Sequence, residues 1–310
     1  MTYRVPLLIL TLCLLVAAGC EERPQSGSTT RGSVSIECDE SVLPVMEAQR
    51  DDFQRTYTEA RVQLRPAEAR EAITDFFNDS VRVIVIGREL NKEERGALNA
   101  AKIDMQEFKI ALGGVAVIVN KGNPLDELRI GQLDSIFTGV LTRWPGKRNT
   151  IEIAIGHVNS STNEVFRTLI LKGKQFSPEA TSFSSSKRLV EFVRDARNAI
   201  GIAGLGWLRG GMDQQVTVVA VGDPNSRPDS TRPMGEFYKP FQAYIHQKYY
   251  PIARPLYIYT RELSNLTVGY GFIAYLTSAQ GQQIFLNNGL VPVTMPVRIV
   301  NITSEQVKPR

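Results

Sequence analysis

Residues 159–162 read Asn-Ser-Ser-Thr, a polar run that leads directly into the apolar-periodic stretch "NEVFRTLILKG". One interpretation is a helix cap, because Ser161 followed three residues later by Glu164 has the spacing of a capping box. The other is a seat for a small anion, since the unpaired amides and the dipole at a helix N-terminus attract negative charge. Asn159 fits either interpretation, as a turn residue that bonds its own backbone or as a ligand-binding group.

The composition is that of a globular protein and excludes several classes of function. Hydrophobic residues make up 43% of the 310 residues, and charged residues make up 22%. The net charge of +4 is spread without a dense Lys/Arg block, which gives no reason to expect nucleic acid as a partner. Of the three cysteines, Cys13 would be removed with an export signal and Cys20 would carry a lipid, which leaves only Cys38 as a free thiol. We therefore expect no disulfide within the chain, no cysteine metal site and no cofactor.

The first nineteen residues have the features of an export signal. Arg4 is followed by the apolar run "VPLLILTLCLLVAA", which is too short to span a membrane comfortably. The run ends in "AAGC", which resembles the lipobox of bacterial lipoproteins and implies a lipidated Cys20. An ordinary secretory signal is the alternative. Residues 20–32, rich in Pro, Ser, Gly and charge, then form a flexible tether.

From residue 33 onward, short apolar runs alternate with helical periodicity, which predicts an α/β fold with a largely parallel sheet. Two long strands, residues 114–120 and 254–260, stand at the edges of a middle block. If both are crossovers, residues 33–119 and 255–300 make lobe I, residues 120–254 make lobe II, and residues 301–310 are a tail. Two lobes joined by two strands would hinge around a cleft. The run "VTVVAV" reads as one strand, and the stretch from Asn265 to Gly289 as helix.

The stretch "GGVAVIVNKGNPLDELRIGQLDSIFTGVLTRWPG" is similar to the phosphate ABC-transporter substrate-binding proteins, in which Asn-x-x-Asn-Pro ends a hinge strand and precedes a Leu-x-x-Ile-Phe-x-Gly helix. "SVLPVMEAQRDDF", "GREL", "AIGIAGLGWL" and "YPIARPLYIYT" also match, so the resemblance extends from about residue 33 to 295. It implies a type II periplasmic-binding-protein fold, two α/β lobes joined by two crossover strands.

The resemblance also implies an anion site. In the family, helix N-termini, hydroxyls, an Arg and an Asp that accepts a proton from bound phosphate grip the ligand. Carried over, Ser41 matches the family's Thr or Ser, and Ser160, Ser161 and Thr162 match its Ser-Gly-Thr. Val42 and Asn159, their neighbours in the chain, are further candidates for anion binding.

The charged contacts of the family are not matched. Its Arg before the Ser falls on Gly156, its acidic or hydroxyl residue after the third strand falls on Gly87, and "RPAEAR" replaces a Gly-Ser-Ser region. Arg88 at the end of a strand is the favoured replacement cation, because α/β sites form at that edge. Arg70 and His157 are further candidates. Arg88 could equally pair with Glu89, Glu93 or Glu94, and His157 could be an ordinary loop histidine.

An enzyme has little support in the sequence. It contains no Gly-x-Ser-x-Gly elbow, no Walker loop and no His-Glu-x-x-His, and its two histidines, His157 and His246, give no evident triad.

The expected function is therefore that of a cell-envelope solute-binding lipoprotein. It would be a monomer, held at the membrane only by its lipid, that captures phosphate or a related oxyanion for an ABC permease. The alternative is an interaction or sensing module that keeps the fold but has lost tight anion binding, as the glycines at positions 87 and 156 suggest.

Overall fold

The computed structural model describes residues 27–144, 149–209, 214–222 and 237–294. Cys20, most of the expected tether and the tail of residues 301–310 lie outside these ranges. Within them, no helix has the length and apolar character needed to cross a membrane.

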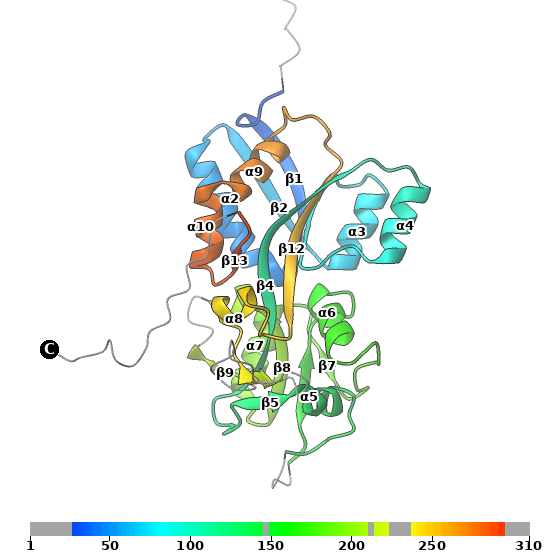
Figure 1. Cartoon of the computed structure of the whole chain (residues 1–310), viewed down its shortest axis with the longest axis vertical. Coiled ribbons are helices and arrows are strands. Elements are labelled where there is room, and N and C mark those ends of the chain that lie inside the picture. Colours follow the sequence, from blue (N-terminus) through cyan, green and yellow to red (C-terminus); the bar gives the residue numbers. More distant parts are fainter. Residues whose placement is uncertain (1–26, 145–148, 210–213, 223–236, 295–310) are drawn as a thin grey trace, which may run out of the picture.

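The chain forms two α/β lobes, one above the other in Figure 1. The upper lobe is built around these elements: β1 (Gly32–Asp39), η1 (Glu40–Val42), α2 (Leu43–Thr56), β2 (Ala60–Ala67), α3 (Ala69–Phe77), β3 (Val83–Ile86), α4 (Lys92–Ala100), α9 (Val268–Thr277), α10 (Ala279–Asn287) and β13 (Val291–Pro292). The lower lobe contains these elements: β5 (Glu127–Arg129), α5 (Ile130–Phe137), β6 (Glu152–Ile155), α6 (Ser161–Leu169), β7 (Thr181–Ser182), α7 (Ser186–Asp195), β8 (Ala199–Gly204), η2 (Leu205–Leu208), β9 (Val216–Val218), β10 (Ala220–Gly222), β11 (Phe237–Tyr238) and α8 (Gln242–His246).

Two long strands join the lobes, at the places that the sequence indicates. β4 (Gln106–Asn120) and β12 (Ala253–Thr260) pair antiparallel through the first part of β4. The second part of β4, from Val115 to Val119, pairs with β8 of the lower lobe. One sheet therefore runs through both lobes in the order β2-β1-β3-β12-β4-β8-β6-β7. The expected α/β architecture with two crossover strands is confirmed. The sheet is mixed rather than largely parallel, because β12 and β4 pair antiparallel with their neighbours.

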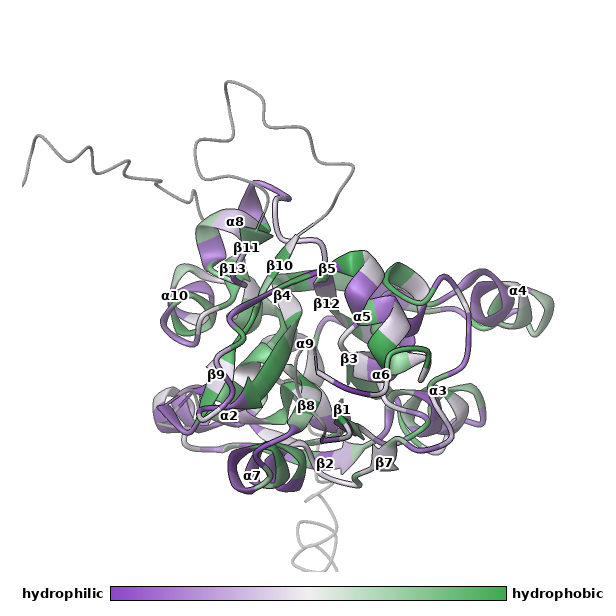
Figure 2. Cartoon of the chain, turned by 90° about the horizontal axis from the view of Figure 1, so that it is seen from below, coloured by the Kyte–Doolittle hydropathy of each residue, from purple (hydrophilic) through white to green (hydrophobic). Residues whose placement is uncertain are grey.

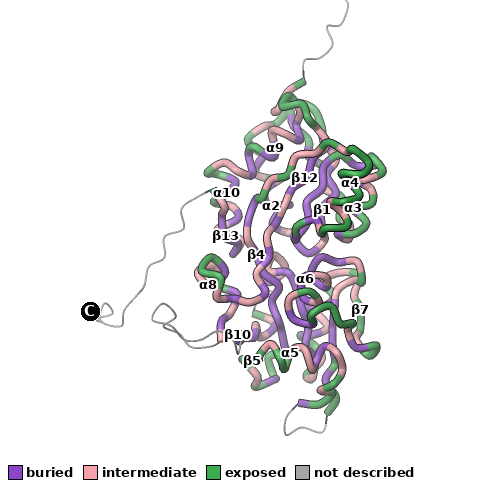
Figure 3. The backbone as a smooth tube through the Cα atoms, turned by 45° about the vertical axis from the view of Figure 1, so that its right-hand side comes forward, coloured by how far each residue is buried: buried purple, intermediate pink, exposed green. Residues whose placement is uncertain are grey.

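The strands are the most buried part of the molecule. All four residues of β3 and all six of β8 are buried, as expected for strands covered by helices on both faces. Figure 2 shows β4 and β8 as mainly hydrophobic, whereas α2 and α7 carry hydrophilic residues as well. Figure 3 shows the same contrast as burial: the central strands, such as β4, are mainly buried and the helices expose one side. Each lobe thus has its own apolar core.

Two details of the expected secondary structure are wrong. The helix expected from Asn265 to Gly289 is two helices, because Ser278 ends α9 and caps α10 by accepting a hydrogen bond from the Gly281 amide at 3.3 Å. The run "VTVVAV" is divided at Val219 into β9 and β10, which belong to different sheets. In addition, α4 forms in a charged stretch for which the apolar pattern gave no helix.

Candidate functional site

Hydroxyl groups from the two lobes meet where strands end and helices begin. Ser41 lies in η1, directly after β1, and Ser161 and Thr162 open α6, just after β6. The Ser41 and Ser161 hydroxyl oxygens lie 3.1 Å apart, although 120 residues separate them. All three residues are buried. The carboxyl ends of parallel strands are where α/β folds place ligands.

Arg254, the second residue of β12, lies among these hydroxyls. Its Nη1 donates to the Ser161 hydroxyl at 2.7 Å and lies 3.4 Å from the Thr162 hydroxyl. Its Nη2 donates to the Ser41 hydroxyl at 3.0 Å. We name the side chains of Arg254, Ser41, Ser161 and Thr162 the hydroxyl–arginine cluster.

The charge of Arg254 has no carboxylate partner among the residues that the structure describes. The residue is 3% exposed, and its Nε has no hydrogen-bond acceptor there. Burial lowers the pKa of the guanidinium and the charges of Asp39 and Glu40 partly oppose this shift, and an arginine keeps its proton in proteins. A buried cation that contacts only neutral hydroxyls is costly by itself. The arrangement suits a bound anion, for which a guanidinium offers paired donors.

Asp39 holds Ser41 in place. This fully buried carboxylate accepts hydrogen bonds from the Ser41 amide at 3.0 Å and the Ser41 hydroxyl at 2.8 Å through one oxygen. Its other oxygen accepts from the Gly87 amide at 3.0 Å. Because the Ser41 hydroxyl proton is directed to Asp39, its oxygen is left to accept from Arg254.

Two glycines leave the space that Arg254 occupies. A Cβ atom on Gly87 would lie 2.7 Å from Arg254 Nη1 and 2.9 Å from the Ser161 hydroxyl. A Cβ on Gly204 would lie 2.8 Å from Arg254 Nη2 and 2.4 Å from the Ser41 carbonyl oxygen. Gly87 stands where the related family has an acidic or hydroxyl residue. Because glycine has no side chain, the guanidinium of Arg254 from β12 can occupy this space.

The family model for the PBP superfamily domain matches residues 23–280. The chain belongs to this superfamily. Among curated relatives, the phosphate-binding protein PstS of Staphylococcus aureus strain USA300 is 24% identical over 279 residues, covering 87% of this chain and 81% of PstS.

Solved structures of PBP proteins share the fold. A Clostridium perfringens protein with bound phosphate, described as a phosphate ABC transporter substrate-binding protein, aligns with a TM-score of 0.72 and 24% identity over 84% of this chain and all of its own. An ABC-type phosphate transport receptor from Vibrio cholerae aligns with a TM-score of 0.63 and 20% identity, over 85% of this chain and all of its own. The fold is thus the expected type II periplasmic-binding-protein fold.

The cap of α6 in this PBP chain is Ser160, one residue earlier than the capping box that the sequence suggests. The Ser160 hydroxyl accepts from the Asn163 amide at 3.2 Å. The Asn163 side chain also bonds the Gly156 amide and carbonyl, which fixes the preceding loop. Capping therefore uses Ser160 and leaves the side chains of Ser161 and Thr162 to the hydroxyl–arginine cluster.

The structure does not place Arg88 in this cluster. Its guanidinium pairs with Glu94 at 2.7 Å and with Glu164 at 2.9 Å, and the side chain is 7% exposed. Of the ion-pair partners that the sequence allows, the structure uses Glu94, and it adds Glu164 from the other lobe. Two carboxylates already neutralise Arg88, so this residue links the lobes by an ion pair.

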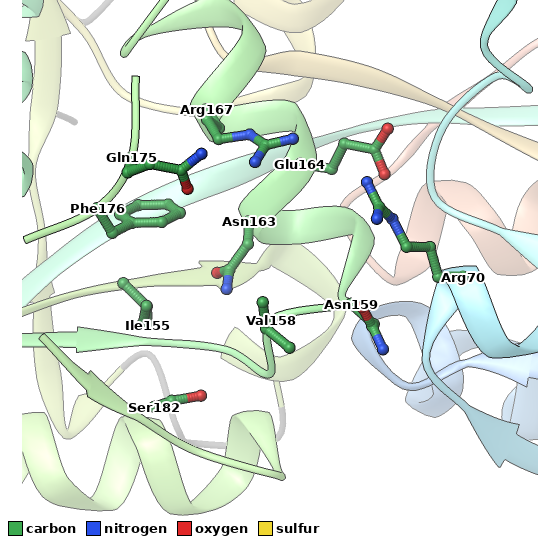
Figure 4. Close-up of a pocket in the computed structure, with 10 residues that line it drawn as sticks. All are labelled: Arg70, Ile155, Val158, Asn159, Asn163, Glu164, Arg167, Gln175, Phe176 and Ser182. Atoms are coloured by element: carbon green, nitrogen blue, oxygen red, sulfur yellow. The ribbon is translucent and has the colours of Figure 1, made fainter. Parts of the chain in front are cut away.

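The remaining predicted site residues lie around the cluster. Arg70 and Asn159 line a cavity of about 220 Å³ beside α6, where Arg70 extends from α3 towards Glu164 (Figure 4). The Arg70 amide donates to the Asn159 carbonyl at 3.3 Å. His157 Nδ1 lies 3.9 Å from a Glu68 carboxylate oxygen. Val42 is buried beside Ser41 and lines a small cavity that Arg254 also lines.

Two further acidic residues, which the sequence analysis missed, lie at the junction of the lobes. The Glu40 carboxylate accepts from the Ser186 amide at 2.9 Å and the Ser186 hydroxyl at 2.6 Å, at the N-terminus of α7. Burial raises the pKa of Glu40. Burial, together with the charges of Asp39, Glu40 and Glu71, raises the pKa of Glu68 to about 8. Both line a small cavity with Ser41 and Thr162.

Signals for the missed residues exist in the sequence. Asp39 is the last residue of the apolar strand β1, and an acidic side chain is seldom fully buried unless it is paired. Arg254 is the single charge within the run "YPIARPLYIYT", a strand-like stretch in which every neighbour is uncharged. A charge in such a strand predicts either an edge position or a buried polar site.

Proposed function

We propose that this protein is an extracytoplasmic solute-binding protein that captures inorganic phosphate, or a related oxyanion, for an ABC transporter. The observation that carries the proposal is Arg254, a buried cation surrounded by hydroxyls of both lobes, with no carboxylate partner in the described part of the chain. The relatives and structural neighbours whose names refer to phosphate support the choice of ligand.

In the proposed complex, the anion lies between the lobes against the hydroxyl–arginine cluster. Arg254 supplies the positive charge, and the hydroxyls of Ser161 and Thr162 donate to the anion. The Ser41 hydroxyl turns from Asp39 to the anion on binding, and the amide of Val42 and the first amides of α6 supply further donors. Asn159 and Ser160 shape the entrance to α6. Arg88, Arg70 and His157 lie farther out, and we assign them to lobe contact rather than to charge compensation.

Asp39 is the proposed acceptor for a protonated ligand oxygen. It is buried beside Ser41, where a hydrogen phosphate could donate a proton to a carboxylate. Sulfate carries no proton at neutral pH and would meet the carboxylate as a repulsive group. We therefore expect phosphate and arsenate to bind more tightly than sulfate.

The remaining assignments complete the same proposal. Cys20 would carry the lipid that holds the protein at the outer face of a membrane, where the permease is its partner, and the protein would be a monomer. Residues 33–119 and 255–300 would move as one lobe and residues 120–254 as the other. Binding with closure of the lobes would be its whole chemistry, without catalysis.

Isothermal titration calorimetry of the mature protein with phosphate, arsenate and sulfate tests the proposal. Heat of binding with phosphate and arsenate, and weaker binding of sulfate, is the expected result. The glycines at positions 87 and 156 favour a module that has lost tight anion binding, whereas in our proposal Arg254 supplies the cation that is absent at position 156. If none of the three anions gave heat or a thermal shift at millimolar concentration, the sensing or interaction module would be the better description.

A further inference from the structure

A second cavity adjoins the hydroxyl–arginine cluster through Arg254. It has a volume of about 510 Å³ and lies between the loop after β3, the start of α4, and α6, with residues Ala253 to Pro255 of the crossover strand also lining it. Arg254 lines this cavity and also donates to Ser41 and Ser161. Arg254 therefore lies between this cavity and the place where the proposed anion binds.

Inorganic phosphate would leave this space unused. Cavities of about 300 to 1,000 Å³ hold drug-sized organic molecules, whereas a phosphate ion needs little more than the donors around it. The hydroxyls and the guanidinium already offer those donors without the second cavity. A specific function for the larger cavity therefore requires a ligand with more atoms than phosphate.

The lining of the second cavity suits an organic group. Leu90, Val165, Leu169 and Pro255 give it apolar walls, and the exposed Thr168 of α6 lies on its side. The charge of Arg88, which also lines it, is matched by Glu94 and Glu164. Glu89 is hydrogen-bonded to the Tyr257 hydroxyl at 2.9 Å. Glu89 and Lys92 are exposed and give the lining one further charge of each sign. An uncharged, partly apolar substituent would contact the apolar walls and leave these two charges in water.

We propose that the ligand is a phosphate monoester with a small organic substituent. This inference depends on the proposed function, because the phosphoryl group occupies the hydroxyl–arginine cluster. The ester oxygen points past Arg254, and the organic group lies in the second cavity against α6. Inorganic phosphate binds to the same cluster but leaves the cavity empty of ligand, and it is the weaker ligand.

Calorimetry with a graded series of probes tests the inference. Inorganic phosphate, methyl phosphate and phenyl phosphate share the anionic group and differ only in the substituent, while phenol supplies the ring without the anion. We expect phenyl phosphate to bind about tenfold or more tightly than inorganic phosphate, with methyl phosphate between them, because apolar groups in a matched pocket give differences of this size. Phenol alone should not bind.

Variants at Thr168 test whether the organic group of the ester binds in the second cavity. Thr168→Trp places a ring in the second cavity from an exposed helix position and should remove the advantage of phenyl phosphate, while inorganic phosphate binds within about twofold of the unmodified protein. Thr168→Ala is the matched control and should keep the preference for the ester. Circular dichroism and thermal unfolding confirm that both variants are folded.

The results separate the two proposals. If phosphate binds and the esters bind no better, or if the preference survives Thr168→Trp, the second cavity is not a ligand subsite. Binding of phenol alone would also overturn the inference, because the cavity would then hold apolar molecules independently of the anion. If neither phosphate nor any ester binds, the proposed function itself fails, and this inference fails with it.

Discussion

The guanidinium of Arg254 lies 2.7 Å from the Ser161 hydroxyl, although 93 residues separate the two in the chain. One of them stands on a strand that joins the lobes, and the other opens a helix of the lower lobe. The same guanidinium donates to Ser41 of the upper lobe at 3.0 Å. A ligand bound at Arg254 would therefore contact both lobes and the connection between them.

Replacement of Arg254 by methionine should separate binding from stability. Loss of a buried charged partner commonly weakens binding by about 2 to 5 kcal/mol, so we expect phosphate affinity to fall at least about 30-fold. In phosphate-free buffer, the melting temperature should change little, because the substitution removes a buried cation that forms no ion pair in the described residues, and this gain offsets the loss of its attraction to Asp39 and Glu40. Calorimetry and thermal unfolding measure the two effects.

Arg88→Met is the matched control for this prediction. It leaves Glu94 and Glu164 without their cation, so the melting temperature should fall, while phosphate affinity stays within a few-fold of the unmodified protein. The opposite pattern, with binding lost at Arg88 and kept at Arg254, would return the role of charge complement to Arg88.

Gly87→Ala should weaken phosphate binding by displacing Arg254. The new Cβ would lie 2.7 Å from Arg254 Nη1, a distance that forces the guanidinium or the backbone to move. We expect about tenfold weaker binding or more, with lower stability.

Gly96→Ala in α4 is the control, because a Cβ there meets nothing within 4 Å. This change should stabilise the protein by about 0.5 to 1 kcal/mol and leave affinity unchanged. Equal affinities in both variants would contradict the proposed position of Arg254.

The fold could be predicted because its determinants are local. The alternation of short apolar runs and helical periodicity gives the α/β class, and the two long strands that join the lobes are visible as runs around residues 114–120 and 254–260. The helix joint at Ser278 could not be read from periodicity, because apolar residues recur at helical spacing on both sides of it. There, a serine cap and the close approach of Gly281 to the Tyr275 carbonyl decide the break.

The neutral half of the candidate site could also be predicted, whereas the charged half could not. Ser41, Ser161 and Thr162 follow strands and begin helices, so local rules place them together. Arg88 also follows a strand, but its guanidinium forms ion pairs with Glu94 and Glu164. These ion pairs depend on the tertiary structure, so local rules do not reveal them. Arg254 reaches Ser41 across 213 residues of chain, and only the pairing of β12 with β3 and β4 brings it there.

Trp207 should report the closure of the lobes. Its indole Nε1 donates to the Glu40 carbonyl at 2.8 Å, and the Glu40 carboxylate is bound by Ser186 of the lower lobe. The chain has two tryptophans, so Trp144→Phe leaves Trp207 as the remaining one. In that background, phosphate should shift the Trp207 emission to the blue, since closure removes water from the indole.

Glu40→Gln should weaken this connection in the same Trp144→Phe protein. The Ser186 amide and hydroxyl donate to different oxygens of the carboxylate, and glutamine replaces one of these oxygens by an NH2 donor, so the two bonds cannot both be kept in their present geometry. Without ligand, we expect emission at longer wavelength and a phosphate affinity reduced several-fold, because less of the protein is in the binding-competent form. Ser186→Ala should act in the same direction, and the double variant should add little. Additive effects would show that Glu40 and Ser186 do not act as one contact.

Glu68→Gln should change how stability depends on pH. Burial raises the pKa of this carboxyl from 4.5 to about 8, so between these values the folded protein binds more protons than the unfolded chain. The contribution of Glu68 to stability is therefore complete below about pH 4.5 and is lost as the pH rises through about 8. Glu40, whose pKa is also raised, adds a decline in the same direction. Thermal unfolding at pH 5, 7 and 9 should show a smaller loss of stability with rising pH for Glu68→Gln than for the unmodified protein.

The charged and titratable groups around Glu68 are Asp39, Glu40, Glu71 and His157. His157→Gln therefore serves as the control, and a flatter profile in that variant alone would assign the pH dependence to the histidine instead.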